Sequence, residues 1–123
     1  MNLGVWTQPT AEQYREINEL LRQAKTDIAG GWCQVLCEDS SGRLCTADFE
    51  GVAKYSAKEA LLRSCKSAAV LMAAEDLLGI MATGSPYTFA DWEQKPGRKI
   101  NEVIAIFDRA LIRTAAAMKG NTQ

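Results

Sequence analysis

Residues 10–31 read TAEQYREINELLRQAKTDIAGG, and this stretch predicts a long helix near the start of the chain. Thr10 stands at a cap position and Gln13 follows three residues later, the spacing of a capping box that satisfies two free backbone amides. Gly30 and Gly31 predict the end of the helix. Between these limits apolar side chains recur every three or four residues, as on a helix with one buried face: Tyr14, Ile17, Leu20, Leu21, Ala24 and Ile28.

A β-hairpin is predicted directly after this helix, with strands Trp32–Glu38 and Arg43–Ala47. The turn between them, residues 39–42, begins with Asp and ends with Gly, which tolerates a positive φ. This turn places Cys37 opposite Cys45. Because side chains alternate along a strand, one face of the hairpin is expected to be apolar, with Val35 opposite Ala47. That face consists of Cys33, Val35, Cys37, Cys45 and Ala47.

The middle of the chain is predicted to be helical from a second capping box at residues 56–59 to a stop before Gly79. The pattern allows one helix over residues 57–78, or two helices with a break at residues 64–67, where another cap is available. Residues 81–87 contain glycine and proline, and are predicted to be a loop.

The end of the chain is predicted to contain one helical turn at residues 88–92, a tight turn at residues 95–97 and a last helix from about Lys99 to Lys119. Apolar residues outside the buried stripe of this helix widen its apolar surface, so it is either central in the fold or in contact with a partner. A homodimer is one form of such contact. The stripe is Ile100, Val103, Ile104, Phe107, Ala110, Leu111 and Thr114, and the additional residues are Ile106, Ile112 and Ala115 to Ala117.

These elements predict an α+β fold that is mostly α, with a helix, a small β-hairpin, a helical middle region and a C-terminal helix. The chain has 123 residues, which is close to the commonest domain size, so residues 1–123 are expected to form a single domain. Residues 1–9 are expected to be an irregular lead and residues 120–123 a tail.

Composition excludes several classes of function. The chain contains no histidine, which excludes catalysis by Ser-His-Asp or Cys-His groups. Its 14 basic and 15 acidic residues are scattered, so a nucleic-acid partner is not expected. No apolar run approaches the roughly 18 residues that cross a bilayer. The first residues do not resemble a signal peptide, so we expect a cytoplasmic protein with no membrane partner.

The four cysteines, Cys33, Cys37, Cys45 and Cys65, have the right number for a zinc site or for two disulfides. Their spacing lacks the paired C-x2-C units of common zinc sites, and free cysteine is among the most buried residue types. We predict reduced thiols in the core, no bound metal and no other cofactor. Zinc and a disulfide stay open as alternatives.

Paired carboxylates are the remaining candidates for acid/base chemistry, Glu38 with Asp39 and Asp48 with Glu50. On hairpin ends and loops, such pairs are usually just solvated. No catalytic residue is therefore predicted, and we expect the protein not to be an enzyme.

Four residues form the most suggestive set for ligand or partner binding: Trp32, Gln34, Trp92 and Arg98. Indole and guanidinium groups stack on one another, and the Gln and Arg side chains present hydrogen-bond donors. The same residues also fit a packing role, in which the tryptophans fill space between the hairpin and the helices. An open concavity lined by all four would favour binding, and a dry, packed cluster would favour packing.

Residues 32–34 have a W-x-Q pattern near the predicted hairpin, and residues 90–98 followed by residues 102–110 are similar to W-N-D-x-P-G-R-T before E-V-L-x-L-F-D-R-A. In these two stretches the chain resembles an uncharacterised domain family of unknown function from actinobacterial and phage-encoded proteins, whose members carry these motifs. The resemblance covers most of the chain from Trp32 onward. It implies the fold and a phage or mobile-element origin, but no activity.

The chain departs from the motifs of that family at three positions: Glu93, Gln94 and Lys99 stand where Asn, Asp and Thr are usual. Residues 55–61 match the middle motif, W-C-A-x-G-A-L, only loosely. If the Trp, Cys, Asn and Asp residues of the family form a polar site, that site is damaged here.

The leading hypothesis from sequence is a small non-enzymatic protein that binds and modulates a host or phage protein, with inhibition of a host defence protein as one form. The alternative is a small-ligand pocket or minor enzyme built on Trp32, Gln34, Trp92 and Arg98.

Overall fold

The computed structural model describes residues 9–120 and has an α+β fold that is mostly helical. The predicted lead at residues 1–9 and tail at residues 120–123 lie largely outside this range; Gly120 belongs to the last helix rather than to the tail. The elements, in chain order, are α1 (Ala11–Ala29), β1 (Cys37–Asp39), β2 (Leu44–Cys45), β3 (Val52–Tyr55), α2 (Ala57–Ser64), α3 (Ala68–Thr83), α4 (Phe89–Glu93) and α5 (Ile100–Gly120).

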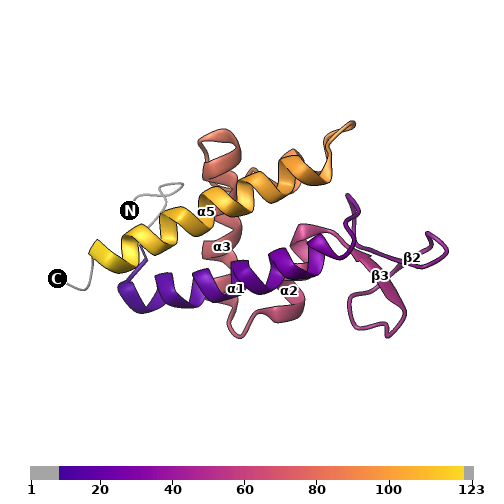
Figure 1. Cartoon of the computed structure of the whole chain (residues 1–123), viewed down its shortest axis with the longest axis horizontal. Helices are drawn as coiled ribbons and strands as arrows, with labels where there is room; N and C mark the ends of the chain where they lie inside the picture. Colours follow the sequence, from indigo (N-terminus) through magenta and orange to yellow (C-terminus); the bar gives the residue numbers. More distant parts are fainter. Residues whose placement is uncertain (1–8, 121–123) are drawn as a thin grey trace.

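Helices α1 and α5 lie side by side and run in opposite directions, and α3 crosses behind them (Figure 1). The predicted capping box at Thr10 and Gln13 is formed in full. A buried polar contact joins the two long helices, since Asn18 Nδ2 donates to Thr114 Oγ1 over 2.7 Å. Near the other end of the pair, the Lys25 ammonium binds the Asp108 carboxylate. These contacts connect residues far apart in the sequence.

The core lies between α1, α2, α3 and α5, with Phe89 of α4 at its edge. The predicted stripe of α1 is entirely buried. Among the additional apolar residues of α5, Ile106 is buried in this core, but Ile112 is 71% exposed and Ala115 and Ala116 are exposed as well. Helix α5 is therefore central in the fold on one face and keeps apolar side chains on its outer face. None of the helices within residues 9–120 is long and apolar enough to cross a membrane.

The small sheet extends from one end of the helical body (Figure 1) and has the strand order β2-β1-β3. The predicted register of Cys37 with Cys45 is confirmed, and Asp39 closes the turn as expected. The predicted strand Trp32–Glu38 is wrong in extent, and the pairing of Val35 with Ala47 does not form. Leu36 has a φ of 53°, which breaks the extended backbone before Cys37.

Strand β3 was not predicted, and it occupies the side of β1 away from β2. In place of the longer hairpin, the segment before β1 pairs with β3: Tyr55 N donates to Gly31 O over 2.9 Å, and Cys33 N donates to Tyr55 O over 3.2 Å. The sheet is therefore attached to the end of α1 through Gly31 and Tyr55.

The open question of the middle region is resolved as two helices, α2 and α3, with Ser67 capping the second. The predicted stop before Gly79 is wrong, because α3 continues through Gly79 to Thr83 and ends at Gly84, whose φ is 87°. The loop was predicted from residue 81, three residues too early, since it begins only at Gly84. A Cβ on Gly79 would lie 3.0 Å from Ser85 O, so this glycine permits close packing of the following loop.

Candidate functional site

The four residues singled out from sequence come together where the segment before β1 meets α4 and the turn that follows it. Arg98 lies with its guanidinium carbon 3.9 Å from the centre of the Trp92 ring. Its Nε donates to Trp92 O over 2.9 Å, and its Nη1 forms an ion pair of 3.0 Å with Glu102. Arg98 thus ties the turn at residues 95–97 to the start of α5.

Trp92 also belongs to a column of aromatic rings that leads into the core. Its ring stacks on Phe89 at 5.7 Å, and Phe89 meets Phe107 edge to face at 6.4 Å. The cluster therefore connects α4 to the buried face of α5, as aromatic residues in a core do.

Gln34 reaches across from the segment before β1 to the end of α4. Its Nε2 donates to Lys95 O over 2.7 Å and to Glu93 O over 3.2 Å. Both amide hydrogens that would contact a ligand are therefore used to hold two parts of this chain together.

Glu93 is the central residue of this cluster, and sequence reasoning did not select it. Its side chain is 1% exposed, and one carboxylate oxygen accepts two hydrogen bonds. Trp32 Nε1 donates to it over 2.8 Å, and the backbone N–H of Ala57, the first residue of α2, donates over 2.6 Å. Glu93 thus joins the segment before β1, α2 and α4. The one signal for its burial in the helix pattern is its spacing: Glu93 follows Phe89 by four residues on α4, so the two side chains share the buried face of this helix.

Burial raises the pKa of Glu93 to about 6, against the opposing effect of the hydrogen bonds from Ala57 and Trp32. The folded chain therefore holds a proton in a pH range where the unfolded chain, with a pKa of 4.5, has released it. The resulting stabilisation is fully present below pH 4.5 and is lost as the pH rises through about 6.

We expect the free energy of unfolding of the wild type to fall by about 2 kcal/mol, relative to that of Glu93→Gln, between pH 4 and pH 7. Glutamine has no titrating proton, so the difference between the two proteins isolates this group from the other carboxylates. Urea unfolding at several pH values measures it. Two parallel stability curves would contradict the buried position of Glu93.

The hydrogen-bond donors of this cluster are paired with other groups of the same chain. Within residues 9–120, no buried side-chain nitrogen or oxygen lacks a hydrogen-bond partner. Three hollows lie on the surface of this part of the chain, one beside α1, one beside α3 and one beside α2, and none of them is lined by the four residues selected from sequence. These contacts favour a packing role for Trp32, Gln34, Trp92 and Arg98 over ligand recognition.

All four cysteines are free thiols, and two of them, Cys33 and Cys37, are buried. Burial, the largest cause, raises the pKa of Cys33 to about 11 and that of Cys37 to about 12. Such thiols stay protonated at neutral pH and are poor nucleophiles. In the described part of the chain, no three Cys, Asp or Glu side chains are grouped so that they could hold a metal ion.

The carboxylate pairs have structural contacts. Asp39 Oδ1 accepts hydrogen bonds from Ser41 and Arg43, which close the turn between β1 and β2 and hold the pKa of Asp39 below its usual value. Asp48 Oδ1 accepts a hydrogen bond from the hydroxyl of Thr46. Because Asp39 stays ionised within its turn, it is a poor proton donor for catalysis.

Large apolar side chains are exposed around the sheet, away from the tryptophan cluster. We call the five in or beside the sheet the sheet-end hydrophobics. Leu44 is 64% exposed and Phe49 is 51% exposed. Such side chains are usually buried, and several of them at one end of a domain are typical of an interaction surface. The set is Val35, Leu36, Leu44, Phe49 and Leu62.

A hollow of about 450 Å³ lies between α2 and the segment from β2 to β3. We call it the β2–β3 hollow. Its lining combines two apolar residues with four polar or charged ones, and the apolar Leu62 is one of the sheet-end hydrophobics. The lining residues are Thr46, Ala47, Asp48, Glu59, Leu62 and Arg63.

Comparison with known proteins adds no relative: no protein-family model matches the chain, and neither a curated protein nor a solved structure matches it.

Proposed function

We propose that this chain is a non-enzymatic protein-interaction protein that binds its partner through the sheet-end hydrophobics. The exposure of these five side chains is the observation that carries the proposal. Strand β2, which forms one edge of the sheet, has only two residues. Burying large apolar side chains against a partner would remove them from water, which is the main driving force of most protein association.

The chemistry of the remaining candidates supports a binding role rather than catalysis. The buried thiols of Cys33 and Cys37 are protonated at neutral pH, and Asp39 accepts the hydrogen bonds that close its turn. The polar groups of the tryptophan cluster form hydrogen bonds within the chain. On the sequence resemblance, we propose a phage or mobile-element origin and a host or phage protein as the partner. Inhibition of a host defence protein is one form that this binding would take.

A photo-crosslinking amino acid at position 44 tests the proposal in cells that produce the chain. We expect a crosslinked protein product from position 44 and none from position 72, since Met72 is 60% exposed but lies on α3, away from the sheet. A product of twice the chain mass would identify a second copy as the partner. Equal products from both positions would contradict the proposal.

The double variant Leu44→Ser with Phe49→Ser is expected to fold normally but to lose at least tenfold in affinity for that partner. Both side chains are more than half exposed, so the free energy of unfolding should change by less than about 0.5 kcal/mol. Truncating apolar residues at the centre of an interface is usually costly for binding. Thermal unfolding followed by circular dichroism checks the fold. The binding is checked by the crosslink yield from the same photo-crosslinking amino acid placed at position 36, since Leu36 is 47% exposed.

A further inference from the structure

The β2–β3 hollow combines an apolar wall with two carboxylates. Leu62 is 47% exposed beside it, and Asp48 and Glu59 are on its lining. Its volume of about 450 Å³ lies within the range of roughly 300–1,000 Å³ usual for ligand pockets. The hollow opens widely to solvent, so a side chain of a partner can lie in it without being enclosed.

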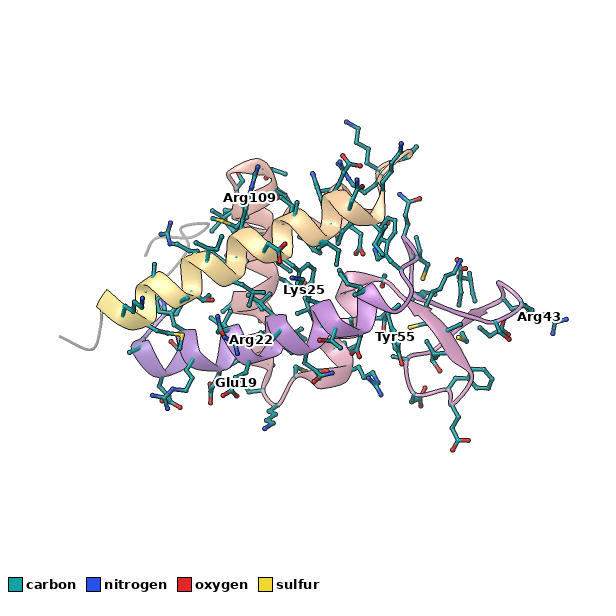
Figure 2. The ribbon with its side chains drawn as sticks, in the orientation of Figure 1. Glu19, Arg22, Lys25, Arg43, Tyr55 and Arg109 are labelled. Atoms are coloured by element: carbon teal, nitrogen blue, oxygen red, sulfur yellow. The ribbon has the colours of Figure 1, made fainter. Side chains whose placement is uncertain are left out.

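Arg63, the cationic residue that lines this hollow, already binds other groups of this chain. Arg63 forms an ion pair of 3.2 Å with Asp27 of α1, and its guanidinium carbon lies 5.4 Å from the centre of the Tyr55 ring. Figure 2 shows Tyr55 at the junction of α1 with the sheet. Arg63 still lines the hollow, but Asp27 balances its charge, so the net charge of the hollow comes from Asp48 and Glu59.

The two carboxylates have no cationic partner among residues 9–120. Asp48 accepts the neutral hydroxyl of Thr46, and Glu59 stands in the first turn of α2, where a negative charge is stabilised. Arg43 of the neighbouring turn points outward from the tip of the sheet (Figure 2) and forms no ion pair with the described part of the chain. The hollow therefore has an unbalanced negative charge next to apolar surface.

We propose that the partner inserts a lysine or arginine into the β2–β3 hollow, from a segment in which this basic residue is flanked by apolar side chains. Its aliphatic stem would pack against Leu62 and its charged head would lie near Asp48 and Glu59. Long basic side chains commonly combine an apolar stem with a charged tip in this way. The flanking residues would cover the other sheet-end hydrophobics. This inference rests on the proposed function and adds the chemistry of the partner.

A display library of random 12-residue peptides, selected on the full chain, provides a defined probe. We expect selected peptides to be enriched in lysine or arginine next to apolar residues. Their dissociation constants should rise with salt, because exposed ion pairs are screened. Fluorescence anisotropy with the synthesised peptides gives these constants.

The charge of the hollow is tested with Asp48→Asn combined with Glu59→Gln, which removes both charges and keeps the hydrogen-bonding atoms. We expect the dissociation constant to rise about tenfold at low ionic strength, from the loss of two charge interactions. The matched control is Glu16→Gln combined with Glu19→Gln, which changes the net charge equally on α1. Figure 2 shows Glu19 away from the sheet, and Glu16 lies three residues nearer the start of the helix. The control should bind within about twofold of the wild type.

The possible failures are distinguishable. One outcome is that the peptides bind the Leu44→Ser, Phe49→Ser variant more weakly, but carry no basic residue or bind the Asp48→Asn, Glu59→Gln variant as well as the wild type. This outcome would overturn the basic occupant and leave the proposed function standing. Peptides that bind equally well without Leu44 and Phe49 would overturn both.

Discussion

Replacing Glu93 with alanine is expected to lower the free energy of unfolding by about 3 kcal/mol. The substitution leaves the indole N–H of Trp32 and the backbone N–H of Ala57 without an acceptor at a site that is 1% exposed. Each buried donor without a partner costs roughly 1–3 kcal/mol, and the lost packing adds to this. Urea unfolding at neutral pH measures the change, and a melting temperature lower by roughly 10 °C should accompany it.

The control for this prediction is Asp91→Ala on the same short helix. Asp91 is exposed, so its replacement should change stability by less than about 0.5 kcal/mol. A second variant separates the hydrogen bond from the packing: in the presence of Trp32→Phe, which removes one donor, Glu93→Ala should cost less than it does alone. Additive effects would mean that Trp32 and Glu93 do not interact.

Replacing Gly31 with alanine is expected to destabilise the chain by about 2–3 kcal/mol and to detach the sheet from the end of α1. A Cβ at this position would lie 2.4 Å from Ala53 O, a backbone atom that cannot move without disturbing β3. Gly31 O also accepts the hydrogen bond from Tyr55 N, so any movement to relieve the clash weakens this pairing. Forcing extra atoms into a packed site typically costs 1–3 kcal/mol.

The neighbouring glycine provides a matched control. Gly30 has a φ of −78°, and its nearest contact for a Cβ is 3.5 Å, so alanine fits there without strain. Gly30→Ala should leave stability unchanged or raise it by about 0.5 kcal/mol, because alanine restricts the unfolded chain. Hydrogen exchange at the amides of Cys33 and Tyr55 reports the local effect. Equal behaviour of the two variants would contradict the close approach at Gly31.

Much of the fold follows from local patterns. The first and last helices were predicted within one or two residues, because caps and apolar spacing act between residues less than one or two turns apart. The Cys37 and Cys45 register was predicted because the turn at residues 39–42 sets it. Strand β3 was missed because its pairing with β1 and its attachment at Gly31 connect distant residues.

The candidate site divides in the same way. Sequence patterns selected Trp32, Gln34, Trp92 and Arg98, and the structure brings them together, but their donors bind groups of this chain. The sheet-end hydrophobics could not be separated from core residues by residue type, since Leu36 and Leu44 look like ordinary strand residues. Only packing decides which apolar side chain finds a neighbour and which stays exposed.

By itself, the sequence determined where the long helices begin and end, which turn closes the hairpin and which histidine-dependent chemistry is excluded. Tertiary structure alone decided that Glu93 is buried against Trp32 and Ala57, that α3 continues through Gly79 and that Asp48 and Glu59 line one hollow. The physical reason is range: caps, turns and helical spacing are interactions between near neighbours in the chain. Burial, clashes and charge pairing depend on segments that meet only after the chain has folded.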